Sequence, residues 1–358
     1  MSIKNPLHVN EITPEWLTRI LREGGSITES HVTAIDVQSV GGSVGFLSSV
    51  VKTILTYDAV EEGAPKSLVI KIEPESESYR QASDQLHAFT REIMFYRNVA
   101  PGVSMRLPRL YGSVIEPPAY ALAMEDLCSL RPGDQVRGIS EEEALGITEE
   151  IAKLHARYWN SPELDGFEWM PSENPVWQDY GEKWPSFTEH FGGLLESNGR
   201  AVGEKLLKHV EWLAGEISSR PKTIVHSDLR ADNLLFGSPG SDDWVVIIDW
   251  QIAIKSMGAF DVARLTAGSE QTSELKQYHY EAVNRWYGTL IEGGVGLYTM
   301  DDAVRDYKLG LLLNLCFPVH FHREALTVTG RTKDLVMTMI TRDFAAAAEF
   351  DAGSVLPG

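Results

Sequence analysis

The stretch VHSDLRADNLLF, residues 225–236, places a histidine, two aspartates, an arginine and an asparagine between apolar residues. Asp228 precedes a predicted strand, and a carboxylate there could accept the proton of a hydroxyl group or orient that hydroxyl. Arg230, two residues later, could lie against a phosphate oxygen. An ordinary polar turn uses the same residue types. The pattern therefore indicates chemistry only if other parts of the chain supply matching groups.

A second acidic residue, Asp249, ends the apolar run WVVIID. Strand-like segments at 233–236 and 244–249 flank the turn GSPGSDD, which predicts a hairpin whose ends bring Asn233 and Asp249 together. Amide and carboxylate oxygens are the hard ligands that Mg²⁺ prefers. The spacing therefore predicts a magnesium site at Asn233 and Asp249.

A glycine-rich segment, GGSVGF at 41–46, lies between two predicted strands. Glycines let a backbone approach a ligand closely, and its N–H groups could cover phosphates. A hairpin turn needs the same residues, so the segment alone is a weak signal. The candidate phosphate-covering residues are Gly41, Gly42, Ser43 and Gly45.

Lys71 lies inside the apolar strand LVIKIE, and Glu92 follows 21 residues later on the predicted helix FTREIMFY. A lysine is costly to bury unless a carboxylate pairs with it. Glu92 is the expected partner, and the pair could present an ammonium group to a phosphate. The alternative is a half-exposed strand from which Lys71 points into solvent.

The segment ALAMEDL, residues 121–127, ends the sheet-forming part of the chain. The backbone of Glu125 and Leu127 could hydrogen-bond a purine edge there. Asp261, in GAFDVARL, could face a substrate or serve as a helix N-cap. His155 is expected to be a packed, hydrogen-bonded core histidine.

Residues 160–200 are unusually aromatic and have no clear helical or strand period. Trp177 and Trp184 could form a cation–π pocket beside acidic residues, although tryptophans more often belong to a core.

The first 125 residues predict an antiparallel sheet with an inserted helix over 84–99, preceded by a helix over 13–23. The expected strands are 31–40, 50–57, 68–73, 111–114 and 119–125. Later segments predict helices over 141–159, 201–219, 271–292, 301–316 and 331–350. This is an α+β pattern with two lobes, residues 1–126 and 127–358.

Composition excludes several partners. The net charge of −19 argues against nucleic acid or an anionic membrane surface, which need a basic face. Two cysteines cannot form a disulfide framework, the first residues lack a signal-peptide pattern, and no apolar run is long enough to span a bilayer. These features predict a cytoplasmic protein, and they leave its oligomeric state open.

Taken in order, these motifs resemble the aminoglycoside phosphotransferase/choline kinase superfamily, which has a protein-kinase-like fold. The resemblance covers about residues 38–270 and is closest to bacterial ecdysteroid kinase-like phosphotransferases. The segments that carry it are GGSVGFLS, SLVIKIE, TREIMFYRNVAP, MEDL with PGDQ, HSDLRADN and IIDWQ. One residue departs from the pattern: Ser227 stands where the family usually has glycine.

The resemblance implies specific roles. Asp228 would be the base or the residue that orients the hydroxyl, and Asn233 and Asp249 would hold Mg²⁺. Lys71, held by Glu92, would bind the α- and β-phosphates.

For the nucleotide, residues 41–46 would cover the phosphates and the backbone of Glu125–Leu127 would hold adenine. The implied activity is transfer of the γ-phosphoryl group of ATP to a hydroxyl of a small molecule, with GTP not excluded as the donor.

Two alternatives remain open: a nucleotide-binding pseudokinase without turnover, and a metal-dependent hydrolase using His226, Asp228 and Asp249. The acceptor is also open between an amino or quaternary ammonium alcohol, a steroid-like alcohol and an aminoglycoside.

Overall fold

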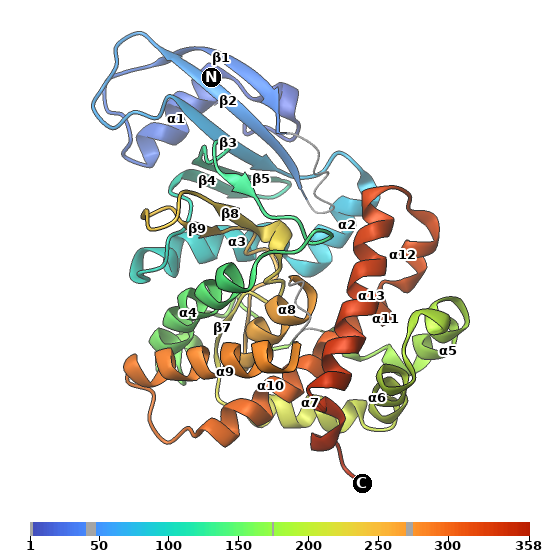
Figure 1. Ribbon diagram of the computed structural model, residues 1–358. Helices are drawn as coiled ribbons and strands as arrows, with labels where there is room; N and C mark the ends of the chain where they lie inside the picture. The colour runs from blue at the N-terminus through green and yellow to red at the C-terminus, as the bar shows by residue number, and fades with distance from the viewer. Residues whose placement is uncertain (1–2, 41–47, 174, 270–274) are drawn as a thin grey trace. The chain divides into compact units, whose positions relative to one another are not determined.

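The computed structural model describes residues 3–40, 48–173, 175–269 and 275–358 (Figure 1). The chain divides into two compact units. The first unit comprises Met1–Gly102, Arg106–Arg131 and Leu235–Ile252, and the second comprises Val103–Met105, Pro132–Leu234 and Ala253–Gly358. The mixed α+β class and the antiparallel N-terminal sheet are confirmed. The division differs from the expected one because the segment 235–252 belongs to the first unit.

The first unit is built on a five-stranded antiparallel sheet with the order β1-β2-β3-β5-β4. Its strands are β1 (Val32–Ser39), β2 (Ser49–Tyr57), β3 (Ser67–Ile72), β4 (Leu110–Glu116) and β5 (Ala119–Glu125). In the central strand β3, Lys71 lies opposite Val50 of β2 and Leu122 of β5. All five strands therefore occur where alternation and turn signals predicted them.

Helix α1 (Pro14–Glu23) supplies the main apolar cover of this sheet. Thr13 caps the helix by accepting a hydrogen bond from the Trp16 amide, and Pro14 occupies the first turn, as the sequence predicted. Trp16 and Ile20 are buried in one cluster with Leu68 and Ile70 of β3. The position of Lys71 is thus fixed because other side chains of β3 are buried in the hydrophobic core.

The single helix expected over 84–99 is two helices, α2 (Glu77–Leu86) and α3 (Ala88–Asn98). His87 separates them because its φ of 50° is left-handed, which a continuing right-handed helix cannot contain. The sequence around residue 87 contains no glycine or proline from which a helix break could be predicted.

A smaller three-stranded sheet has the order β6-β8-β9, with β6 at Arg131–Pro132, β8 at Leu234–Phe236 and β9 at Val245–Ile247. Strands β8 and β9 correspond to the hairpin that the sequence predicted. The hairpin accounts for the inclusion of residues 235–252 in the first unit.

The second unit is mainly helical. Its helices are α4 (Glu141–Tyr158), α5 (Tyr180–Phe191), α6 (Ser197–Leu207), α7 (Val210–Ser219), α8 (Ala259–Ser269), α9 (Leu275–Glu292), α10 (Met300–Asn314), α11 (Cys316–His320), α12 (His322–Thr327) and α13 (Arg331–Glu349). A two-stranded sheet pairs β7 (Thr223–Val225) with β10 (Ile254–Ser256). Short 3-10 turns are η1 (Val9–Glu11), η2 (Ala100–Gly102), η3 (Pro162–Gly166), η4 (Pro175–Trp177), η5 (Gly192–Leu194), η6 (Ala231–Asn233) and η7 (Ala352–Val355), of which η1 and η2 belong to the first unit.

Two expectations for this unit need correction. The helix expected over 201–219 is α6 followed by α7, and the region expected to be irregular contains α5. Helix α5 buries Tyr180, Trp184, Phe187 and Phe191, which are spaced four, three and four residues apart. This aromatic stripe is a helical signal, although Pro185 within it argues locally against a helix.

Helix α8 anchors the second unit, because all of its residues are buried. It packs against α10, where a Cβ at Gly310 would lie 3.0 Å from the Ala263 methyl group. No helix among the described residues is long and apolar enough to cross a membrane.

The close approach of α1 to β4 gives a stability prediction. A Cβ at Gly24 would lie 1.8 Å from the carbonyl oxygen of Tyr111, so Gly24→Ala forces backbone to move. We expect the free energy of unfolding to fall by about 1–3 kcal/mol, measured by chemical denaturation. Glu23→Ala, at the neighbouring exposed position, is the control and should change it little. Equal effects of the two substitutions would contradict the packing argument.

Candidate functional site

In the first unit, Lys71 is 5% exposed and lies between two carboxylates. Its Nζ is 2.7 Å from Glu92 Oε2 on α3 and donates a hydrogen bond to Asp249 Oδ1 at 2.8 Å. The contact with Glu92 is a close ion pair without the alignment of a hydrogen bond. The predicted Lys71–Glu92 partnership is therefore present, with Asp249 as a second partner that was not expected.

The pKa values in this cluster follow from burial and charge. Burial lowers the pKa of Lys71, but the carboxylates of Asp249 and Glu92 outweigh it and leave the pKa raised. Burial raises the pKa of Glu92, Lys71 lowers it and the nearby Asp249 carboxylate raises it again, with a net increase. Lys71 is thus a permanent cation at neutral pH, held in one place.

Asp249 follows β9 and has a left-handed backbone, with a φ of 69°. Aspartate tolerates this region better than most residues because its short polar side chain can hydrogen-bond locally. The next residue, Trp250, is fully buried and stacks on Phe95 of α3 with ring centroids 3.9 Å apart. With its amide oriented to satisfy its neighbours, Gln251 donates to Asp249 Oδ1 and accepts from Lys71 Nζ. These contacts fix the Asp249 carboxylate beside α3.

In the second unit, Asp228 lies on the segment 226–233 that follows β7, which we call the Asp228 loop. Arg264 of α8 donates to its Oδ1 through Nη2 at 2.9 Å and through Nε at 3.3 Å. Its Oδ2 accepts from Arg230 Nε and from Asn233 Nδ2, both at 3.1 Å. Arg264 was missed at the sequence level because nothing near it in sequence resembles a partner for residue 228.

Burial alone would raise the pKa of Asp228, but Arg230 and Arg264 lower it to about 2. The carboxylate therefore remains ionised at neutral pH. Arg230 also forms an ion pair with Asp232 at 2.5 Å. In this arrangement its guanidinium is bound to two carboxylates, and the expected contact with a phosphate stays a prediction.

Asp261 holds the Asp228 loop in place through hydrogen bonds. Its carboxylate accepts hydrogen bonds from the amides of His226 and Ser227 at 2.7 and 2.8 Å. It also accepts from His155 Nε2 at 3.3 Å, because Nδ1 of that ring accepts from Trp286 Nε1. Asp261 is completely buried, so the expected substrate contact is wrong and the residue holds the loop instead. The expectation of a packed, hydrogen-bonded His155 is confirmed.

Ser227, the position that departs from the family pattern, has a φ of 69°. This is the left-handed region in which glycine is free of strain and serine costs about 1 kcal/mol. The unusual residue therefore falls where the backbone most favours glycine. His226 stabilises the turn, since its Nδ1 accepts a hydrogen bond from the amide of Asp228.

Gln135, in the PGDQ motif, is a further support that was not assigned from the sequence. Its Oε1 accepts from the amide of Ala231 at 2.7 Å and from Ser269 Oγ at 2.8 Å. The backbone amide of Gln135 donates to Asp232 Oδ1 at 2.9 Å. The buried side chain of Gln135 thus links Ala231, near the C-terminal end of the Asp228 loop, to Ser269 of α8.

At the end of β5, the amide of Glu125 donates to Arg109 and the carbonyl of Leu127 accepts from Leu130. An adenine ring would have to use the other backbone groups of this segment, and that contact stays a prediction. Asp126 holds the segment in place by accepting from Ser67 Oγ at 2.6 Å and by pairing with Lys52 at 2.7 Å. Burial raises the pKa of Asp126, but these partners lower it well below its usual range.

The remaining expectations have different outcomes. Trp184 is 5% exposed and packs against Tyr180 and Phe344, so it is a core residue and the cation–π role expected for it is wrong. Trp177 is partly buried in η4, and its substrate role stays a prediction. The phosphate-covering candidates Gly41, Gly42, Ser43 and Gly45 lie outside the described residues.

The expected magnesium ligands, Asn233 and Asp249, belong to different units, so their convergence stays a prediction. Each is individually suited to a hard cation. Asn233 donates through Nδ2 to Asp228, which leaves its Oδ1 without a partner among the described residues. The Asp249 side chain is 38% exposed and offers a carboxylate oxygen beyond the one bound to Lys71.

Comparisons with known proteins agree with this geometry. The model of the phosphotransferase enzyme family matches residues 55–290. A crystal structure of choline kinase from Cryptosporidium parvum Iowa II is similar, with a TM-score of 0.57 at 12% identity over 96% of this chain and 98% of that chain. The GDP complex of wild-type aminoglycoside 2'-phosphotransferase-IIIa has a TM-score of 0.51 at 15% identity over 92% and 97%. No curated protein sequence matches this chain significantly. At these identities the structures establish a shared fold.

The clamp on Asp228 predicts a pH-dependent stability. Because the pKa is about 2 in the folded chain and 3.8 ordinarily, the ionised carboxylate stabilises the fold above pH 4 by about 2 kcal/mol. That contribution is lost as the pH falls through 2. Asp228→Asn should therefore lower the free energy of unfolding at pH 7, and its difference from the wild type should shrink between pH 4 and pH 2.

Denaturant unfolding at several pH values measures this difference. Asp242→Asn, at an exposed position, is the matched control and should follow the wild type throughout. A constant difference between Asp228→Asn and the wild type from pH 7 to pH 2 would rule out the clamp as its cause.

Proposed function

Because the chain belongs to the phosphotransferase enzyme family, we propose that it is a small-molecule kinase that transfers the γ-phosphoryl group of ATP to a substrate hydroxyl with Mg²⁺. The observation that carries the proposal is the buried Lys71 between Glu92 and Asp249. A cation fixed in this way can bind phosphate oxygens without reorganising when charge shifts during transfer. A buried charge cluster serving only stability would be replaceable as a whole by apolar residues at little cost.

Asp228 would orient the attacking hydroxyl. With a pKa of about 2 it is a weak base at neutral pH, so its main task would be to accept a hydrogen bond from the hydroxyl and direct a lone pair at phosphorus. Phosphoryl transfer tolerates a weak base because its transition state is loose and late proton loss suffices. Arg264 would keep the carboxylate in the required rotamer through its two contacts with Oδ1.

The acceptor hydroxyl would need one of the positions around Asp228 Oδ2 that Arg230 and Asn233 occupy. Asn233 is the more deeply buried of the two and also donates to the Asp228 carbonyl. Arg230 has Asp232 as a second partner to which it can remain bound. We therefore expect Arg230 to yield its contact with Asp228 when an acceptor binds.

Mg²⁺, when bound by Asn233 Oδ1 and the Asp249 carboxylate, would neutralise charge on the phosphate oxygens. The chain's own contribution is to keep these two oxygens available. Asn233 is oriented by its hydrogen bonds to Asp228, and Asp249 by those from Lys71 and Gln251.

For the acceptor, we propose an alcohol that carries an amine or quaternary ammonium group. Most of the chain's net charge of −19 falls in residues 127–358, which favours a cationic substrate. Two relatives of the same fold are described as a choline kinase and as a GDP and kanamycin complex, and both choline and kanamycin are cationic alcohols. A steroid-like alcohol remains the competing class suggested by the sequence motifs.

A screen of amino alcohols, aminoglycosides and steroid alcohols tests this proposal. Purified protein with ATP and Mg²⁺ should release ADP only with an acceptor, and Asp228→Asn should lower that rate by at least about 100-fold. GTP in place of ATP reports the donor preference. Nucleotide binding without acceptor-dependent turnover above the variant would identify a pseudokinase, and tightly bound zinc or iron without nucleotide affinity would favour the hydrolase.

A second prediction concerns Lys71. Lys71→Met should raise the Michaelis constant for ATP or lower turnover by at least about tenfold, because the phosphates lose a fixed cation. Steady-state kinetics with the best acceptor measures both constants. Lys66→Met removes an exposed lysine just before the same strand and should leave both unchanged. Normal kinetics in Lys71→Met would refute the phosphate-binding role.

A further inference from the structure

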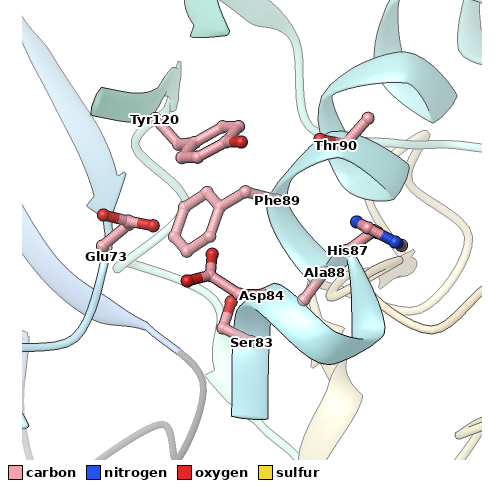
Figure 2. A pocket seen from close by; sticks show the side chains of 8 residues that line it. All are labelled: Glu73, Ser83, Asp84, His87, Ala88, Phe89, Thr90 and Tyr120. Carbon is pink, nitrogen blue, oxygen red and sulfur yellow. The ribbon is translucent and has the colours of Figure 1, made fainter. Parts of the chain in front are cut away.

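A polar hollow lies within the first unit, lined by side chains to which no role was assigned above. It is a small, solvent-open hollow of about 20 Å³ between β3, β5 and the junction of α2 and α3. Its lining residues are Glu73, Ser83, Asp84, His87, Ala88, Phe89, Thr90 and Tyr120 (Figure 2). The proposed phosphoryl transfer uses none of them.

Glu73 is the most unusual residue of this pocket. It follows β3, two residues after Lys71, and is only 5% exposed. No residue that the structure describes forms a hydrogen bond or ion pair with its carboxyl group. Figure 2 shows this group directed at the ring of Phe89. A buried carboxyl without a partner costs free energy that a bound ligand could recover.

The charge around Glu73 favours a cationic ligand. Asp84 of α2 places a second carboxylate beside the Phe89 ring in Figure 2. The guanidinium of Arg80 acts on Glu73 electrostatically, and it donates hydrogen bonds to the Pro74 carbonyl and to Glu77. His87 is exposed at the rim. The lining thus contains two carboxylates and no lysine or arginine.

Two aromatic rings complete the lining. Phe89 of α3 and Tyr120 of β5 lie with centroids 6.1 Å apart and planes tilted by 33°. Ring faces attract organic cations, and most strongly where a carboxylate balances the charge. We propose that this pocket binds the ammonium group of a small amine, held by Glu73 and Asp84 against the rings of Phe89 and Tyr120.

An ammonium group fits this lining better than a metal ion does. Nowhere in the described part of the chain do three or more histidine, cysteine, aspartate or glutamate side chains converge as metal ligands. A calcium or magnesium ion takes six or more oxygens and is strongly hydrated. An ammonium group needs only a few acceptors and gains from contact with the rings.

Ammonium binding at this site depends on pH. Burial, together with the Asp84 carboxylate, raises the pKa of Glu73 to about 7, and Arg80 opposes the increase. Burial and the same two carboxylates raise the pKa of Tyr120, which stays neutral. Since the ionised form of Glu73 attracts the ligand, affinity should rise by about tenfold between pH 6 and pH 8.

Methylammonium chloride is a suitable probe because it has no hydroxyl and cannot be a phosphoryl acceptor. Its binding to the full chain, without nucleotide, is measured by ligand-observed nuclear magnetic resonance at constant ionic strength. We expect saturable binding at pH 8 that weakens at pH 6. Glu73→Gln should weaken it by at least tenfold and remove the pH dependence, and Asp84→Asn should weaken it less.

Glu75→Gln, at an exposed position two residues further on, is the matched control and should bind like the wild type. Circular dichroism of each variant establishes that it is folded. The proposal is overturned if the wild type shows no saturable binding, if Glu73→Gln binds equally well, or if potassium chloride competes at equal concentration. Because the assay contains no nucleotide or acceptor, its failure would leave the proposed kinase activity unaffected.

Discussion

The organisation of the first unit depends on the burial of one ammonium group. An unpaired Lys71 at this depth would cost several kcal/mol, so β3 can hold it only if carboxylates reach it from elsewhere. One comes from α3, 21 residues later, and the other from the segment after β9, 178 residues later. The Trp250–Phe95 stack brings these two segments together. Satisfying one charge therefore requires three distant parts of the chain to assemble.

The second unit uses the reverse arrangement, in which one anion is held by two cations. Asp228 is clamped by Arg230 and Arg264, as Lys71 is clamped by Glu92 and Asp249. In both clusters the paired charges keep the central group ionised at neutral pH. Under the proposed function, these two charges of opposite sign, each fixed by its surroundings, would be the preorganised groups that phosphoryl transfer needs.

Local sequence patterns were sufficient to predict the sheet and the Lys71–Glu92 pair. The alternation of apolar and polar residues and the presence of a lysine in an apolar strand can both be recognised within a short segment of sequence. They were insufficient where the determining partner is remote. Arg264 contacts Asp228 from α8, 36 residues away in sequence. Asp261 is buried by contacts with residues that are also remote in sequence. Trp184 was misassigned because aromatic composition was considered without its helical spacing in α5. The break between α2 and α3 depends on the positive φ of His87, which cannot be predicted from the presence of a histidine.

The hydrogen bonds that Asp261 accepts from the amides of residues 226 and 227 bear on how the protein is synthesised and folds. The motif HSDLRADN is complete once residue 233 has been synthesised, yet its strained turn at Ser227 is held by a carboxylate 34 residues further along the chain. During translation the residues of the loop are therefore synthesised before the residue that holds their conformation. A nascent or truncated chain that ends before α8 would contain every residue of the motif and lack the support that shapes it.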